Sequence, residues 1–166
     1  MCVGWLVWFG FVATLPALCG FIGGVLGGII SDAILRKTNS LTLARKIPII
    51  GGMLLSMSII ACNYVDGQAL VIGFMALAFF GKGIGALGWA VVSDTSPKEA
   101  GGVSGGLFNT FGNISSITTP IIIGYILAAT GSFAGALVFV GANALVAAFA
   151  YLVIVGKIER VKLRTA

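Results

Sequence analysis

The stretch at residues 9–31, FGFVATLPALCGFIGGVLGGIIS, contains no charged residue. A helix that crosses the hydrocarbon core needs about 20 predominantly apolar residues, because each residue rises about 1.5 Å through a layer about 30 Å thick. Lipid offers no water to the peptide groups, so the backbone has to satisfy them within a helix. The stretch therefore predicts a membrane-spanning helix. It lacks the basic start and short apolar core of a cleaved secretory signal.

Four further apolar runs follow the first. The chain is 58% hydrophobic and 9% charged, whereas soluble domains carry about 25% charged residues. The runs are too long and too evenly apolar for the alternating strands of about 10 residues that form membrane barrels. We therefore predict an all-α, polytopic membrane helix bundle. Its five expected spans are residues 9–31, 47–65, 68–93, 101–129 and 133–156.

The basic residues lie in alternate connections. Nine of the ten lysines and arginines fall in the first connection, the third connection and the tail at residues 157–166. Lysine and arginine concentrate in cytoplasmic loops, so these segments are expected in the cytoplasm and the N-terminus outside. Basic clusters at the ends of apolar runs indicate a lipid bilayer as the partner and do not form a face for nucleic acid.

The third connection contains Ser96-Pro97-Lys98-Glu99. A serine three residues before a glutamate is typical of a capping box, and proline is favoured at the first helical position. The fourth helix is therefore expected to begin at Pro97. A plain polar turn is the alternative interpretation.

Glycines recur every fourth residue in several spans. In membranes, small residues in one row allow two helix backbones to approach closely. The first span is therefore expected to pack against another helix. These pairs and triplets are Gly20, Gly24 and Gly28; Gly23 and Gly27; Gly81 and Gly85; Gly101 and Gly105; and Gly102 and Gly106.

No catalytic or cofactor chemistry is expected. The chain has no histidine, and its carboxylates form no pair at a shared depth. Residues 83–88, GIGALG, match the letters of a dinucleotide fingerprint, but that motif requires a strand before it and a helix after it. Here it follows an apolar helical run. We therefore predict no cofactor, no metal site and no enzyme activity.

Lys82 is the one charged residue deep within a span. A lysine at the bilayer centre costs about 2.5 to 3.5 kcal/mol on insertion scales, which indicates a cavity, a partner or an anionic ligand. Snorkelling to the interface or a structural ion pair are the alternatives. Trp89 lies two turns further on the same helical face. It is either a site residue or a member of an interfacial aromatic belt.

The fourth span carries a polar stripe. Asn109, Asn113 and Ser116 share one helical face near the midplane. Their side chains can bind the hydroxyl and carboxylate groups of a polar solute, or they can join neighbouring helices.

Residues 28–37, GIISDAILRK, resemble the repeated loop motif of the major facilitator superfamily, although the usual glycine before the second basic residue is absent. The resemblance places this motif on the cytoplasmic side. It implies a conformational switch at Asp32 and Arg36. Asp32 could face the positive end of the helix starting near Pro97, or it could be an ordinary acid at a helix end.

Three further stretches resemble the D-glucarate and D-galactarate permeases of the anion:cation symporter family. They are residues 80–89, 93–97 and 105–113. The likeness covers residues 9–160, and residues 1–8 match poorly. It implies helices eight to twelve of a twelve-helix inner-membrane carrier that imports sugar-acid dianions with protons. It also implies that Trp89 and Asn109 face the central substrate site.

We add Lys82 and Asn113 to this expected substrate site because of their depth in the membrane and the chemistry of their side chains. We further expect the chain to lack the N-terminal half of the carrier and to be inactive without it. Two alternatives remain open at this stage. The substrate could be another organic anion, such as galactonate or a hexuronate, or the chain could be a truncated membrane protein that transports nothing.

Overall fold

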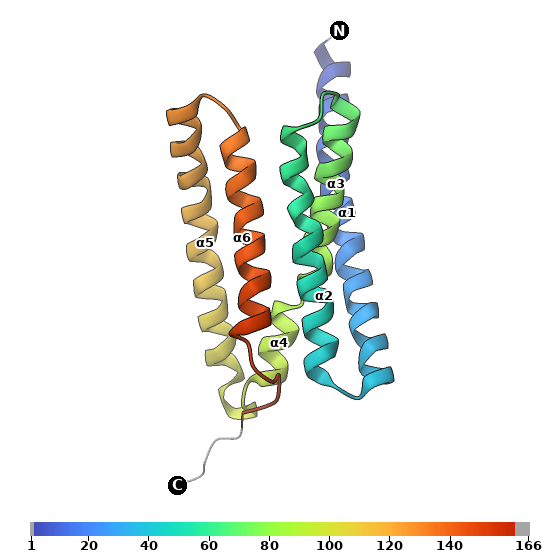
Figure 1. Ribbon diagram of the computed structural model, residues 1–166, viewed down its shortest axis with the longest axis vertical. Coiled ribbons are helices and arrows are strands. Elements are labelled where there is room, and N and C mark those ends of the chain that lie inside the picture. The colour runs from blue at the N-terminus through green and yellow to red at the C-terminus, as the bar shows by residue number, and fades with distance from the viewer. Residues whose placement is uncertain (1, 162–166) are drawn as a thin grey trace.

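A computed structural model describes the backbone of residues 2–161 and the side chains from Thr14 onward. Figure 1 shows two groups of helices that lie side by side. The first group contains α1 (Cys2–Thr38), α2 (Leu41–Ser56) and α3 (Gln68–Ile84), and the second contains α5 (Gly101–Thr130) and α6 (Ala134–Val153). The short α4 (Gly88–Thr95) connects them at the lower end. Two 3₁₀ turns, η1 (Met57–Asn63) and η2 (Lys98–Ala100), complete the order.

Five segments of the described chain are long and apolar enough to cross a membrane, which confirms the all-α, five-span fold class. The helices continue past the predicted apolar limits at the charged end. There α1 continues to Thr38 and α2 begins at Leu41, because a helix need not stop where its side chains leave the lipid. The five segments are Thr14–Thr38, Leu41–Asn63, Gln68–Thr95, Lys98–Thr130 and Ala134–Val153.

Helices α1 and α3 pack with their backbones in close contact, as the glycine spacing predicts. A Cβ atom added at Gly23 would lie 2.2 Å from the carbonyl oxygen of Phe80, and one at Gly27 would lie 2.7 Å from that of Ile84. From the other side, a Cβ at Gly83 would lie 2.1 Å from the carbonyl oxygen of Gly20. Only glycine fits at these points, since any side chain would force the helices apart.

Helix α2 joins the two groups, because it packs on both α3 and α6. Its Ala44 and Ile49 are almost fully buried. Helix α5 differs, since none of its residues is buried. A Cβ at Gly101, Gly102 or Gly106 would meet nothing within 4 Å. The close packing predicted for these glycines of α5 is therefore not formed within the described chain.

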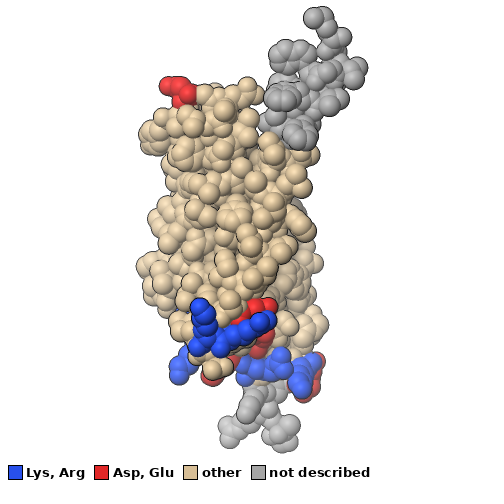
Figure 2. Space-filling view, turned by 90° about the vertical axis from the view of Figure 1, so that its right-hand side faces the viewer, with Lys and Arg blue, Asp and Glu red and all other residues tan. Residues whose placement is uncertain are grey.

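Charged residues gather at one end of the bundle. Figure 2 shows a broad uncharged band above a cluster of lysines, arginines and acidic residues. The loop with Asp66 lies at the opposite end, between η1 and α3. The band has the character of a lipid-facing surface, and the charged cluster that of an interface with water. Residues 162–166 of the predicted basic tail lie outside the described residues.

Candidate functional site

The third span is interrupted in its second half. Helix α3 ends at Ile84 and α4 begins at Gly88. Between them the Ala86 amide donates to the Gly83 carbonyl at 3.0 Å, and the helical pattern resumes where the Val91 amide donates to Leu87. Irregular backbone within a membrane is tolerated where it is buried in protein or lines a water-filled cavity. The span expected at residues 68–93 is found at Gln68–Thr95, and its helix is interrupted between Ile84 and Gly88.

Lys82 and Trp89 flank the break on either side. Both side chains are exposed, and 55% of the Trp89 surface is accessible. The Lys82 ammonium nitrogen lies 5.8 Å from the centre of the Phe79 ring, within range of a cation–π interaction. Lys82 makes no ion pair with any described residue. Its charge is thus left available to an anion.

Trp89 contacts the first half of α5. Its ring meets that of Phe108 edge to face, with centroids 4.9 Å apart and planes at 73°. Such aromatic pairs add about 0.5 to 1.5 kcal/mol beyond their buried area. A Cβ at Gly105 would lie 3.4 Å from the Trp89 ring. The tryptophan therefore fixes the position of α4 against α5.

Asn109 and Asn113 are exposed on α5, and no hydrogen bond of either side chain is formed with the described residues. Helix α5 packs on α4 and α6, with no extensive contact to α3. The structure thus brings Trp89 to α5, but it does not bring Lys82 against the two asparagines. Within the described chain, the asparagines do not join helices.

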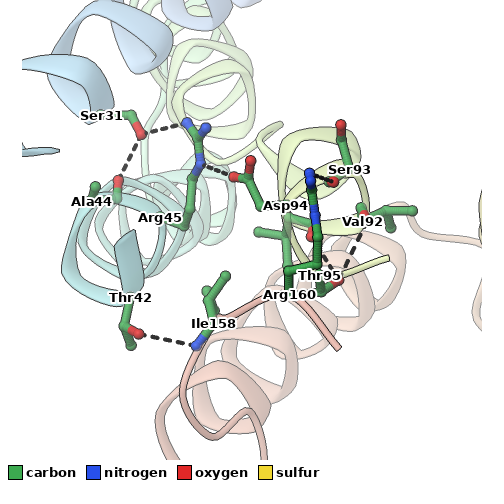
Figure 3. Close-up of polar contacts among 11 residues, drawn as sticks. Ser31, Thr42, Ala44, Arg45, Val92, Ser93, Asp94, Thr95, Ile158 and Arg160 are labelled. Carbon is green, nitrogen blue, oxygen red and sulfur yellow. Dashed lines mark hydrogen bonds and ion pairs between the residues drawn. The ribbon is translucent and has the colours of Figure 1, made fainter. Parts of the chain in front are cut away.

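The charged end holds a network that sequence reasoning missed (Figure 3). The Arg45 guanidinium on α2 pairs with the Asp94 carboxylate on α4 at 2.7 Å. It also donates to the Ser31 hydroxyl of α1 at 2.8 Å. Ser31 is fully buried and donates to the Ala44 carbonyl at 2.7 Å. Three helices are thereby tied together around one guanidinium.

Asp32 lies next to this network but takes no part in it. Asp32 and Arg36 are exposed and, with Ile29 and Ala33, line a shallow cavity of about 160 Å³. Helix α1 packs on α2 and α3 and makes no extensive contact with η2 or α5. The expected contact between Asp32 and the start of the fourth helix is therefore not formed in this structure.

The predicted cap before the fourth helix is also wrong. Ser96 is the last residue of the α4 region, with an extended backbone, and no side chain caps η2 or α5. Residues Lys98–Ala100 form a 3₁₀ turn, so α5 begins at Gly101. Pro97 has an extended ψ of 145° and cannot serve as the first helical residue.

The residues after α6 fold back across the charged ends of α2 and α4 (Figure 3). The Ile158 amide donates to the Thr42 hydroxyl at 3.0 Å, and the Val161 amide donates to the Thr95 carbonyl at 2.9 Å. Lys46 donates to the Val155 carbonyl. With Ile158 only 3% exposed, this tail is packed onto the bundle.

These features define a class of protein. The chain is a multi-pass helical membrane protein with an interrupted span, and exposed polar groups lie on the helices beside the interruption. Among the described residues, no group of three or more potential metal ligands is found. Interrupted helices of this kind mark the binding sites of many secondary transporters.

Comparison with known proteins identifies relatives of the chain. No family model matches the chain. It is 74% identical over 155 residues to a probable galactarate/D-glucarate transporter of Bacillus subtilis (strain 168), and this match covers 93% of the chain and 34% of the relative. A probable galactarate/D-glucarate transporter of Escherichia coli (strain K12) is 67% identical, with the same shares covered. A D-galactonate transporter of Escherichia coli O6:H1 is 42% identical over 152 residues, which cover 92% of the chain and 35% of the relative.

These matches confirm the resemblance of the chain to the galactarate/D-glucarate permeases of the major facilitator superfamily. The chain spans about one third of the length of the relatives that it matches.

Proposed function

We propose that the chain is the C-terminal part of a secondary active transporter that imports galactarate or D-glucarate together with protons. The observation that carries the proposal is the 59–74% identity to five proteins named as galactarate/D-glucarate transporters. The interrupted span and its exposed polar neighbours support it physically, since they supply groups that a polar anion needs at membrane depth. These features favour transport over catalysis.

In this proposal the basic end of the bundle is cytoplasmic and the membrane is the cell inner membrane. The gathering of lysines and arginines at one end supports this orientation. The substrate site lies between this chain and the N-terminal half of the carrier, so the chain alone is inactive.

Four residues contribute to the proposed substrate site. Lys82 supplies a positive charge for one carboxylate, and Trp89 supplies an apolar face for the carbon chain. The amides of Asn109 and Asn113 offer both donors and acceptors to hydroxyl groups. Because Lys82 is separated from the asparagines here, the site requires the substrate, or the rest of the carrier, to join the two helices.

Asp32 and Arg36 are proposed as switch residues at the cytoplasmic end. Both are exposed, and Asp32 directly follows Ser31, which accepts a hydrogen bond from Arg45. An exposed acid and base can pair with the other half of the carrier in one transport state and separate in another.

The direct test is a hybrid carrier in which this chain replaces the matching segment of the Bacillus subtilis relative. We expect proton-dependent uptake of radiolabelled galactarate by cells that produce the hybrid, and none by cells that produce the chain alone. Robust uptake by the chain alone would contradict the proposal. A hybrid that is well expressed but imports no sugar acid would also contradict the proposal.

Substitution of Lys82 tests the site within this hybrid. Lys82→Ala should reduce uptake of the dianion galactarate more than uptake of the monoanion galactonate. Equal reductions for both substrates would show that Lys82 is not the positive partner of a substrate carboxylate.

A second substrate class has a specific observation in its favour. The 42% identity to a D-galactonate transporter shows that a related sequence is associated with a sugar acid that has one carboxylate. Competition of unlabelled galactonate against galactarate in the hybrid separates the two. Stronger competition by galactonate than by unlabelled galactarate would favour the monoanion.

A further inference from the structure

A second cavity lies at the charged end, between α4, the start of α5 and the C-terminal tail. It has a volume of about 300 Å³, within the range of sites for small ligands. Its lining residues are Trp89, Val92, Ser93, Ser96, Pro97, Lys98, Gly101, Gly105 and Arg160.

The lining of this cavity is positively charged. Lys98 and Arg160 contribute two cations, and none of the described residues that line the cavity is an aspartate or glutamate. The nearby Asp94 carboxylate is already paired with Arg45 at 2.7 Å, so it does not neutralise them. Two cations around a space without a carboxylate favour an anionic ligand.

The donors that line the cavity are largely unoccupied. The Arg160 guanidinium makes one long hydrogen bond, 3.4 Å to the Ser93 carbonyl, although it carries five N–H donors. Lys98 has no hydrogen-bond or ion-pair partner among the described residues. The guanidinium geometry is suited to binding both oxygens of a carboxylate.

The cavity extends to the predicted substrate residue Trp89. That ring forms one wall, and the glycines at positions 101 and 105 leave the α5 side without large side chains. The same space therefore connects the region beside the α3–α4 break with the cations at the end of the bundle. An anion that leaves the region of Trp89 towards the basic end would pass through it.

We propose that this cavity is a release subsite for the sugar acid, with one carboxylate held between Lys98 and Arg160. The inference rests on the proposed function for the identity of the ligand and for the cytoplasmic position of this end. Since both cations are exposed, the subsite binds weakly and is sensitive to salt. Weak binding suits a release step, because the anion has to leave.

The test uses the complete 166-residue chain in detergent, with Trp5 and Trp8 replaced by phenylalanine so that Trp89 is the remaining tryptophan. We expect galactarate to change the Trp89 fluorescence saturably, with weaker binding at high salt. The pair Lys98→Gln and Arg160→Gln should weaken this binding about fivefold or more. Lys157→Gln, on the same tail but outside the lining, is the matched control and should change nothing.

Two results overturn the subsite. The first is a response that is absent, or that is the same in the double variant and the unsubstituted chain. The second comes from nanodiscs of phosphatidylcholine with or without phosphatidylglycerol: a response to the anionic lipid and none to galactarate assigns the cavity to lipid phosphate. Rescue by Lys98→Arg with Arg160→Lys supports a role of charge.

Failure of this inference is distinguishable from failure of the proposed function. If the hybrid carrier imports galactarate while the Trp89 response is absent, only the subsite is wrong. If the hybrid imports no sugar acid, the proposed function fails whatever the fluorescence shows.

Discussion

Helices α1 and α5 carry similar spacings of small residues, yet their surroundings differ. In α1 the glycines at positions 23 and 27 are buried against the backbone of α3. In α5 no residue is buried, and most of its glycines face open space. The spacing therefore shows where a helix can be approached closely, but it does not show which helix approaches it.

The contrast extends to polar groups. The α1–α2–α4 contact buries Ser31 and pairs every member of its small network. The face of α5 presents Asn109 and Asn113 without partners among the described residues. Unpaired amides are costly against lipid. They are suited to a face that meets water, substrate or the other half of the proposed carrier.

The largest effect is expected at the α1–α3 contact. Gly23→Leu should destabilise the bundle by about 3 kcal/mol, because its side chain would overlap the Phe80 backbone and force the helices apart. Unfolding in SDS, followed by circular dichroism, measures the change. Gly28→Leu is the matched control, since a Cβ there meets nothing within 4 Å. Similar losses in both variants would contradict the observed packing.

Removal of the arginine at the charged end should have the next largest effect. Arg45→Gln leaves Asp94 without its cation and should cost about 2 kcal/mol, a value reduced for the partial exposure of both side chains. The same SDS unfolding assay applies. Asp94→Asn in the Arg45→Gln background should recover part of the loss. If the losses of unfolding free energy in the two single variants simply add in the double variant, the interaction between Arg45 and Asp94 contributes nothing to stability.

A smaller effect is expected where the tail meets α2. Thr42→Val removes the acceptor for the Ile158 amide and should cost about 1 kcal/mol. Hydrogen exchange at Ile158 should become faster. Thr110→Val is the control, because its hydroxyl bonds only to the Gly106 carbonyl of its own helix. Unchanged exchange at Ile158 in the Thr42 variant would show that the tail is held by other contacts.

The smallest effect on stability is expected on the open face of α5. Asn109→Leu and Asn113→Leu should alter unfolding by less than about 0.5 kcal/mol, because neither side chain has a partner to lose. The same variants should reduce galactarate uptake by the hybrid carrier at least about tenfold. Thr110→Ala should leave uptake unchanged. If the variants lower the amount of protein in the membrane and leave uptake per protein unchanged, the two asparagines are structural.

The sequence predicts much of this fold because lipid constrains it strongly. Runs of apolar residues locate the five spans, and the glycines of α1 identify its packed face. The break after Ile84 was not predicted, because hydropathy records composition and not the hydrogen bonds between peptide groups. The density of glycine in residues 81–88 was the available signal for it.

The site is less predictable than the spans. Trp89 and Asn109 were selected by resemblance, and Lys82 by the cost of its burial in lipid. The Arg45–Asp94 pair escaped detection because its two residues are far apart in sequence and meet only through the relative rotation of α2 and α4. Likewise, no local pattern indicates that the tail returns to line the cavity near Trp89.

The accessibility of α5 to a thiol reagent shows whether its polar face lines the substrate path. Single cysteines at positions 109 and 113, in a hybrid carrier without other cysteines, would be exposed to a membrane-impermeant thiol reagent with and without galactarate. We expect both positions to react and galactarate to protect them. Cysteines that do not react, or that react equally with and without galactarate, would contradict this expectation.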